Sequence, residues 1–350
     1  MPSMTRRPRV VVTNWVHDEV LDVLAGRFSV DANRAREPWP AWELRRRAGD
    51  AEALLAFMPD RVDSGFLASC PDLKIVACAL KGHDNFDVDA CSECGVWLTV
   101  VPDLLTEPTA ELAVGLTIAL ARNMLAGDRY VRDGQFEGWR PLFYGTGLSG
   151  ASVGIVGMGA VGRAIAERLR GFKPQLSYHD RRRMPAAEET ALALRFLPFD
   201  DLLATSDFVI LALPLARETT QLIGRDALKR MKQGSYLVNP ARGSLVHEEA
   251  VADALECGRL AGYAADVFEM EDWARSGRPH TVSFRLQQYQ DRTVLTPHLG
   301  SAVDSLRRDI AMAAAMSIVD CFEGRTPRGA VNAPKALTGE MAGATGSNAC

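Results

Sequence analysis

The sequence predicts an α/β protein made of two doubly wound domains with parallel sheets. Short apolar runs of strand length alternate with helical stretches along nearly the whole chain, as is typical of βαβ units. A glycine-rich turn stands between one such strand and the next helix, near the middle of the sequence. The chain has 350 residues, and at about 150 residues per domain this length indicates two domains.

Composition excludes several classes of protein. The 40 basic and 44 acidic residues give a net charge of −4, which argues against a nucleic-acid-binding or membrane-surface protein. Apolar residues make up 47% and charged residues 24% of the chain, so global disorder is excluded. We expect no secretory signal, and we find no uncharged apolar run of about 18 residues in the sequence. The sequence therefore predicts a cytoplasmic protein.

The cysteines and histidines do not indicate a metal site. Seven cysteines are scattered along the chain, and Cys91 and Cys94 form a lone CxxC pair. A structural zinc site needs further ligands at a matching spacing, and the six histidines supply none. We expect reduced thiols and no bound metal.

The first hundred residues predict a small doubly wound domain. Residues 106–111 then open a long helix, with Pro108 in its first turn, that is expected to run to about residue 131. A loop over 134–150 follows and carries Trp139 and Tyr144. The strands expected before the long helix are 10–13, 53–57, 73–79 and 96–100, and the helices are 17–25, 42–48 and 63–69.

A second βα series begins at residue 151. Residues 270–292 are too polar and too interrupted by proline for a regular element, so they predict a long loop of the kind that is often functional. Ser301 is expected to cap a helix that runs to about Phe322, and residues 334–350 predict a mobile tail. The strands expected in this series are 153–156, 176–179, 208–213, 235–239 and 261–266.

A G-x-G-x-x-G turn lies between the strand at 153–156 and the next helix. Gly157, Gly159 and Gly162 allow a tight turn, close approach of a diphosphate and close helix packing. The first helical residues, Ala160 and Val161, offer free N–H groups to the phosphates. Asp180 follows 18 residues after Gly162 at the end of the next strand, where a ribose hydroxyl is bound. The pattern predicts a dinucleotide site.

Asp180 favours NAD because its carboxylate repels the 2′-phosphate of NADP. Three arginines follow it directly, beginning at Arg181. One of them could meet a 2′-phosphate, or all three could belong to a solvated turn. We therefore expect NAD as cofactor, with some tolerance of NADP.

Three polar motifs follow the dinucleotide turn, each just after a predicted strand. They contain Arg242, Asp266 with Glu271, and His298. Arginine fixes an anionic substrate with two hydrogen bonds, histidine transfers protons near neutral pH, and a carboxylate beside it holds its tautomer. Any one of these residues alone is more often part of a surface ion pair or a packed loop. Together, at the ligand-binding edge of a parallel sheet, they predict an active site.

On these motifs, residues 8–333 resemble the D-isomer-specific 2-hydroxyacid dehydrogenase superfamily. The resemblance implies a Rossmann NAD-binding domain at 104–301, inserted into a flavodoxin-like substrate domain at 1–103 and 302–333. It implies Arg242, Glu271 and His298 as the catalytic set, an active site in the cleft between the domains, and a homodimer. The cofactor ligands it adds to those above are Thr109, Pro214, Ala241, Arg242, Asp266 and His298, with Asp266 bound to the nicotinamide carboxamide.

Four segments resemble phosphite (phosphonate) dehydrogenases more closely. They begin at Ala56, Cys78, Gly138 and Glu269. Lys81 is the most informative residue, because in ordinary hydroxyacid members its position is usually small or apolar; the alternative is a hydrated loop lysine. The substrate residues that this resemblance implies are Met58, Lys81, Gly82, Asp84, Trp139, Tyr144 and Ser301, although Trp139 and Tyr144 could equally form dimer contacts.

The implied reaction is oxidation of phosphite to phosphate by NAD⁺ and water. Phosphite is largely a dianion, and Lys81 with Arg242 would place two positive charges around it, whereas a monocarboxylate needs one. His298 is then the base that activates water. The main alternative is a dehydrogenase of a 2-hydroxy acid such as glycerate, glycolate or lactate. A second alternative is an NAD(H)-sensing corepressor, against which the complete Arg/Glu/His set argues.

Overall fold

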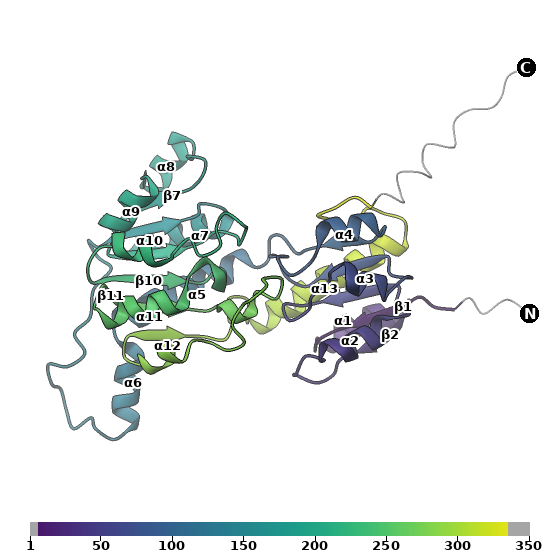
Figure 1. The fold of residues 1–350 in the computed structure, drawn as a ribbon, viewed down its shortest axis with the longest axis horizontal. Helices are drawn as coiled ribbons and strands as arrows, with labels where there is room; N and C mark the ends of the chain where they lie inside the picture. Colours follow the sequence, from purple (N-terminus) through teal and green to yellow (C-terminus); the bar gives the residue numbers. More distant parts are fainter. Residues whose placement is uncertain (1–5, 335–350) are drawn as a thin grey trace, which may run out of the picture. The chain divides into compact units, whose positions relative to one another are not determined.

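The computed structural model describes residues 6–334, which form two compact units. Unit 1 contains the chain up to Leu105 and again from Val303, and unit 2 contains Thr106–Ala302 (Figure 1). The sequence analysis assigns substrate binding to one domain and NAD binding to the other, and these assignments stay predictions. The predicted tail at 334–350 lies, except for Pro334, outside the described residues.

Unit 1 is built on a five-stranded parallel sheet in the order β2-β1-β3-β4-β5, which is the flavodoxin-like order. The Ala-Leu-Leu-Ala and Ile-Val-Ala-Cys runs of β3 and β4 are fully buried, because helices cover both faces of the sheet. α1 and α13 pack on one face, and α2, α3 and α4 on the other. The elements are β1 (Arg9–Val12), α1 (Asp18–Ala25), β2 (Ser29–Ala32), α2 (Ala41–Ala48), β3 (Ala53–Ala56), α3 (Ser64–Ala68), β4 (Ile75–Cys78), α4 (Val88–Glu93), β5 (Trp97–Thr99) and α13 (Asp304–Phe322).

Unit 2 is built on a seven-stranded parallel sheet in the order β12-β11-β10-β9-β6-β7-β8. The strand order reverses between β6 and β9, as in a Rossmann fold. α5 and α7 cover one face, and α9, α10 and α11 the other. The elements are α5 (Thr106–Ala121), α6 (Met124–Arg132), β6 (Ser152–Val156), α7 (Ala160–Leu169), β7 (Gln175–His179), α8 (Ala186–Leu192), β8 (Leu194–Phe196), α9 (Phe199–Thr205), β9 (Phe208–Leu211), α10 (Arg225–Arg230), β10 (Ser235–Asn239), α11 (Glu248–Glu256), β11 (Leu260–Ala265), α12 (Phe284–Gln288) and β12 (Thr293–Leu295), with short 3₁₀ turns η1 (Arg170–Phe172), η2 (Gly243–Leu245) and η3 (Glu269–Glu271).

The predicted fold class, α/β with two parallel-sheet domains, is confirmed, but several elements differ from the prediction. The single helix expected over 106–131 is wrong: Asn123, with φ 52°, separates α5 from α6, and the two axes bend by 64°. The segment 270–292 contains part of η3 and α12. Ser301 is buried in the preceding turn, and α13 begins at Asp304 with Val303 at its N-cap. The sequence analysis gave no bounds for β2, α4, β8 and β12.

Among the described residues no single helix is long and apolar enough to cross a membrane. The bent pair α5 and α6 passes that test by length and composition alone. Much of α5 is buried within unit 2, where it packs against α7 and β11. A core helix of a globular domain has the same composition, so this pair does not indicate a membrane span.

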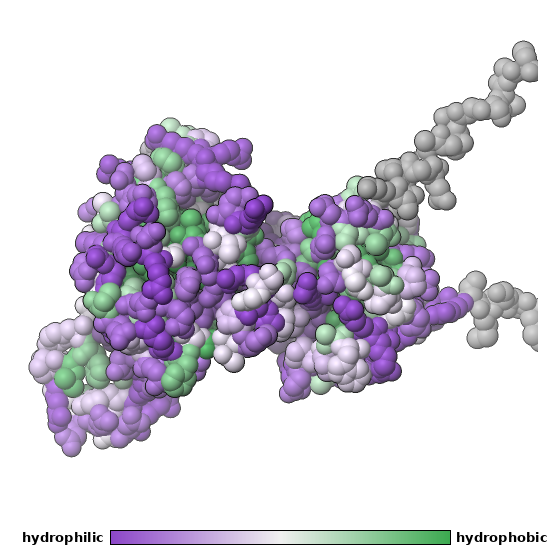
Figure 2. Space-filling model, viewed as in Figure 1, coloured by the Kyte–Doolittle hydropathy of each residue, from purple (hydrophilic) through white to green (hydrophobic). Residues whose placement is uncertain are grey.

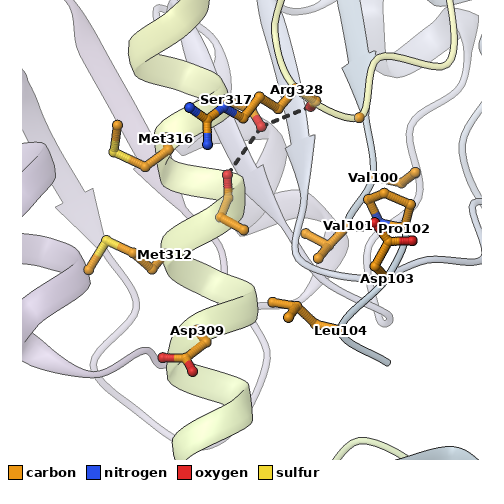
Figure 3. A pocket seen from close by; sticks show the side chains of 12 residues that line it. Val100, Val101, Pro102, Asp103, Leu104, Asp309, Met312, Met316, Ser317 and Arg328 are labelled. Carbon is orange, nitrogen blue, oxygen red and sulfur yellow. Dashed lines mark hydrogen bonds between the residues drawn. The ribbon is translucent and has the colours of Figure 1, made fainter. Parts of the chain in front are cut away.

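A cavity of about 510 Å³ lies in unit 1, beside α13 (Figure 3). Met312 and Met316 line it from the helix, and Val101 and Leu104 from the chain after β5. None of the residues predicted to bind substrate or cofactor lines this cavity.

The buried carboxyl of Asp60 makes the stability of the protein depend on pH. Its Oδ2 accepts hydrogen bonds from the Thr13 hydroxyl and, at 2.7 Å, from the Phe57 N–H, and burial raises the pKa of Asp60 to about 6. In the unfolded chain the pKa is about 3.9, so between about pH 4 and about pH 6 only the folded state keeps the proton. The unfolding free energy therefore falls as the pH rises through this window, by about 3 kcal/mol in total.

We expect Asp60→Asn to flatten this part of the pH profile, because the amide stays neutral and its oxygen can accept the same two hydrogen bonds. Urea unfolding at about pH 4 and about pH 7 measures the difference. Asp72→Asn, at an exposed carboxylate, is the control and should keep the wild-type slope. Parallel profiles for Asp60→Asn and wild type would contradict the assignment.

Candidate active site

The residues predicted in unit 2 gather at one edge of its sheet. Because all the strands are parallel, the segments that follow them emerge at the same carboxyl edge. The glycine turn follows β6, Asp180 follows β7, and Pro214 follows β9. Ala241 and Arg242 follow β10, Asp266 follows β11, and His298 follows β12. The switch point between β6 and β9 lies within this set, where open α/β sheets bind ligands.

The glycines of the β6–α7 turn have different roles. Gly157 has φ 95°, and a Cβ there would lie 2.4 Å from the Ala212 carbonyl oxygen. A Cβ at Gly162 would lie 2.2 Å from the carbonyl oxygen of Gly157, whereas one at Gly159 would meet nothing within 4 Å. The first two glycines are therefore needed by the fold, and Gly159 leaves open space before the N-terminus of α7, where Ala160 and Val161 begin the helix. This is the surface that a diphosphate requires.

Asp180 turns its carboxylate toward this turn. Its Oδ2 accepts a hydrogen bond from Met158 N–H at 2.7 Å, and its Oδ1 accepts one from Arg182 N–H at 3.3 Å. The position beside the phosphate-binding turn suits a ribose-hydroxyl ligand. The residues present therefore fit NAD.

One of the three arginines after Asp180 already has a partner. Arg183 makes two hydrogen bonds to Glu189, of 2.8 and 2.9 Å, and Glu189 also accepts one from the Tyr178 hydroxyl at 2.6 Å. The Arg183 guanidinium holds the pKa of Glu189 at about 2. This arginine thus belongs to a local ion pair, and Arg181 and Arg182 stay the candidates for contact with a 2′-phosphate.

His298 and Glu271 form the most definite pair in the site. His298 Nδ1 lies 2.6 Å from Glu271 Oε2, and Glu271 Oε1 accepts a hydrogen bond from Phe268 N–H at 2.7 Å. Both carboxylate oxygens are therefore engaged, which fixes the carboxylate. With its Nδ1 bound to Glu271, the imidazole has Nε2 available for proton exchange. Both side chains keep 29% of their surface exposed, so a ligand can reach them.

Asp266 organises the loop that carries His298. It is almost fully buried, and it accepts hydrogen bonds from the Thr296 hydroxyl and from the N–H groups of Leu299 and Gly300, at 2.6, 2.7 and 2.8 Å. Burial raises the pKa of Asp266. His298 itself has the uncommon left-handed φ of 57°, and its N–H donates to the Asp266 carbonyl at 2.8 Å. The predicted contact of Asp266 with the nicotinamide stays a prediction.

Arg242 lies in a short turn that is fixed from within. Asn239 accepts a hydrogen bond from Ala241 N–H at 3.1 Å and donates one to the Arg242 carbonyl at 2.8 Å. The Arg242 guanidinium is half-buried and donates to the Ala241 carbonyl at 2.8 Å. The Thr109 hydroxyl of α5 donates to the Gly300 carbonyl at 3.4 Å, and the next residue, Ser301, is buried.

The residues predicted in unit 1 also share one sheet edge. Met58 follows β3, and Lys81, Gly82 and Asp84 follow the neighbouring strand β4. The two segments are joined by a hydrogen bond of 3.4 Å from Asn85 Nδ2 to the Met58 carbonyl. The Nδ1 atom of His83 is buried and has no hydrogen-bond partner among the described residues, which is unusual for a buried polar atom.

The sequence analysis missed Arg307, which lies near these segments of unit 1. It donates to the Ala79 carbonyl at 3.4 Å, and its guanidinium lies 5.8 Å from the centroid of the Phe57 ring. Burial lowers its pKa. The sequence did contain a signal for Arg307. A basic residue in the first turns of a helix interacts unfavourably with the helix dipole, so an arginine at this position indicates a role other than helix stability.

Trp139 and Tyr144 lie apart from the core, with 81% and 76% of their surfaces exposed. They belong to the segment between α6 and β6, and apolar surface gathers at this end of unit 2 (Figure 2). The exposed apolar residues of this segment and α6 are Met124, Leu125, Val131, Phe136, Trp139, Leu142, Phe143 and Tyr144. Their predicted role, at the substrate rim or between subunits, stays a prediction.

No group of three or more potential metal ligands is assembled within residues 6–334. Cys91 and Cys94 are both free thiols, and burial raises the pKa of Cys91 to about 12. The CxxC pair therefore forms no disulfide, and the raised pKa of Cys91 disfavours its thiolate.

Comparison with known proteins gives consistent matches over most of the chain. Residues 114–300 match the family description "D-isomer specific 2-hydroxyacid dehydrogenase, NAD binding domain". The glyoxylate reductases of Thermococcus onnurineus and Pyrococcus horikoshii are each 36% identical over 331 residues, covering 93% of this chain and 96% of the relative.

Solved structures show the same fold over the same extent. The TT0316 protein of Thermus thermophilus has a TM-score of 0.83 at 35% identity, covering 92% of this chain and 99% of that chain. A glyoxylate reductase from Paecilomyes thermophila has a TM-score of 0.80 at 26% identity, covering 95% and 99%.

The two glycine roles predict different outcomes for two alanine variants. Gly159→Ala should weaken NADH binding about tenfold, because its methyl group occupies space that the diphosphate approaches, and should leave the melting temperature unchanged. Gly162→Ala should lower both the affinity for NADH and the melting temperature, because its Cβ meets the Gly157 carbonyl. Fluorescence titration with NADH and thermal unfolding separate these effects. Equal melting temperatures for the two variants would refute the division of roles.

Asp266→Asn should disorder the His298 loop, because the new NH₂ group faces an N–H donor at Leu299 or Gly300. We expect kcat/KM to fall by about ten- to a hundredfold. Asp207→Asn is a matched control, since Asp207 also accepts a backbone hydrogen bond, from the N–H of Ser152 at the start of β6, at 2.8 Å. That variant should lose stability and keep its activity; equal losses of activity would contradict the role of Asp266.

Proposed function

The chain belongs to the D-isomer-specific 2-hydroxyacid dehydrogenase family and is an NAD-binding oxidoreductase, and on that premise we propose that it reduces a small 2-oxo acid such as glyoxylate. The observation that carries this proposal is the His298–Glu271 pair of 2.6 Å, on the same sheet edge as Arg242 and the glycine turn. The relatives named glyoxylate reductase support the choice of substrate.

The proposed reaction is glyoxylate + NADH + H⁺ → glycolate + NAD⁺. NADH, when bound, supplies the hydride to the carbonyl carbon. Arg242 binds the substrate carboxylate through its planar guanidinium. Protonated His298 donates the proton from Nε2 to the carbonyl oxygen as negative charge develops there. Glu271 keeps the imidazole in place through Nδ1 and stabilises its cationic form.

Phosphite is the second candidate substrate, and a specific sequence observation favours it. Lys81 adds a cation to the predicted substrate residues, and four segments resemble phosphite dehydrogenases. The reaction would be HPO₃²⁻ + H₂O + NAD⁺ → HPO₄²⁻ + NADH + H⁺, with His298 as the base that takes a proton from water. The named relatives above are glyoxylate reductases, so phosphite is second. A corepressor role has no observation in its favour.

Oligomeric state and location belong to the proposal as well. We infer a homodimer from the family resemblance and from the exposed apolar side chains of α6 and the segment after it. A cytoplasmic location agrees with the composition. The partners expected are a small anionic substrate and a second copy of the chain, with neither nucleic acid nor membrane.

A direct assay distinguishes the two substrates. We expect NADH to be consumed, measured by its absorbance at about 340 nm, when glyoxylate is added, and no NADH to form from NAD⁺ and phosphite. His298→Asn should lower kcat by at least about a hundredfold, and Arg242→Lys should raise KM because the bidentate contact is lost.

Lys81→Ala adds an independent test of substrate charge. With glyoxylate, a monoanion, we expect KM to change less than about tenfold. Turnover of phosphite by the wild type, abolished by Lys81→Ala, would replace the first proposal by the second. Absence of turnover with both substrates and with other 2-oxo acids, while NADH still binds, would contradict both.

A further inference from the structure

A buried polar network joins the two loops that carry Arg242 and Glu271. η2 begins directly after Arg242, and η3 ends at Glu271. The loops touch at Gly243, where a Cβ would lie 1.9 Å from the carbonyl carbon of Phe268. Such close approach leaves no room for a side chain at Gly243, and polar side chains link the two loops around this contact.

Ser244 is held by two side chains from beyond η3. Its N–H donates to Asp272 Oδ2 at 2.7 Å, and its hydroxyl accepts a hydrogen bond from Arg275 Nη1 at 3.2 Å. Ser244 and Asp272 are buried. Both contacts span 28 residues or more of sequence, so they fix η2 against the loop of Glu271.

The same Arg275 nitrogen binds Glu269 in η3. The distance to Glu269 Oε1 is 2.6 Å, and only 8% of the Glu269 side chain is exposed. Glu269 N–H in turn donates to Glu248 Oε1 at 2.7 Å, and Gln221 donates to Glu269 at 3.1 Å. The guanidinium of Arg275 thus neutralises the buried carboxylate of Glu269 and also binds Ser244 in the opposite loop.

We propose that Arg275 is a positioning residue that locks the Arg242 loop to the Glu271 loop through Ser244 and Glu269. It keeps the substrate-binding guanidinium at a fixed distance from the proton-transferring pair. The consequence for activity rests on the proposed function, because it assumes that Arg242 binds the substrate anion. The lock itself does not depend on the identity of the substrate.

Arg275→Met leaves Glu269 buried without its cation and should lower both stability and activity. The double variant Arg275→Met/Glu269→Gln removes the unpaired charge. If Arg275 only neutralises Glu269, the double variant recovers the wild-type melting temperature and KM together. If it positions Arg242 through Ser244, the melting temperature recovers while KM for glyoxylate stays raised about tenfold or more. NADH affinity should change little in either case.

Arg325→Gln is the matched control, since Arg325 also pairs with a buried carboxylate, that of Asp320 in unit 1. It should lower the melting temperature and leave KM unchanged. Hydrogen exchange reports on the lock without any substrate: the segment 240–247 should exchange about tenfold faster in the double variant and at the wild-type rate in the control. Wild-type KM or wild-type exchange in the double variant overturns the proposal. If the wild type turns over neither glyoxylate nor phosphite, the proposed function fails and hydrogen exchange still decides the lock.

Discussion

The parallel pairing of β10, β11 and β12 is the constraint on which the site depends. Asn239 pairs with Ala265, and Ala265 pairs with Leu295, so the three strands end in one row. Whatever follows each strand must then leave the sheet at the same edge. Arg242, Glu271 and His298 lie far apart in sequence, and this register brings their loops together before any side chain makes a contact.

Beyond the strand ends, the loops are shaped by buried polar groups. Asp266 satisfies three donors of the His298 loop, and Asn239 closes the turn before Arg242. Burying carboxylates opposes folding, as the raised pKa of Asp266 shows. The cost is offset only while each oxygen keeps its donors. These hydrogen bonds explain how the loop of His298 is held in place although the His298 side chain is partly exposed.

The sequence predicted those features that depend on local pattern. Continuous apolar runs such as β3 and β9 correctly predicted strands, since both faces of each sheet are covered by helices. β2 was missed because Ser29 and Asp31 interrupt its apolar pattern, and β8 because the charged Arg195 interrupts its three residues. The break at Asn123 depends on one left-handed residue in a sequence that otherwise favours helix.

In the candidate site, too, the features with a local sequence pattern could be predicted and the contacts between distant segments could not. The glycine turn, Asp180 and the three motifs could be found because each is short in sequence. The partners of Ser244 could not, since Asp272 and Arg275 lie 28 or more residues away in the sequence. The choice between glyoxylate and phosphite depends on neither of these, but on the number of cations that bind the substrate anion. In the proposed reaction Arg242 is the cation that binds the monocarboxylate, whereas oxidation of the phosphite dianion would add a second cation, Lys81. Lys81 is therefore the residue that would distinguish a phosphite-oxidising member of this family from one that reduces a 2-oxo acid.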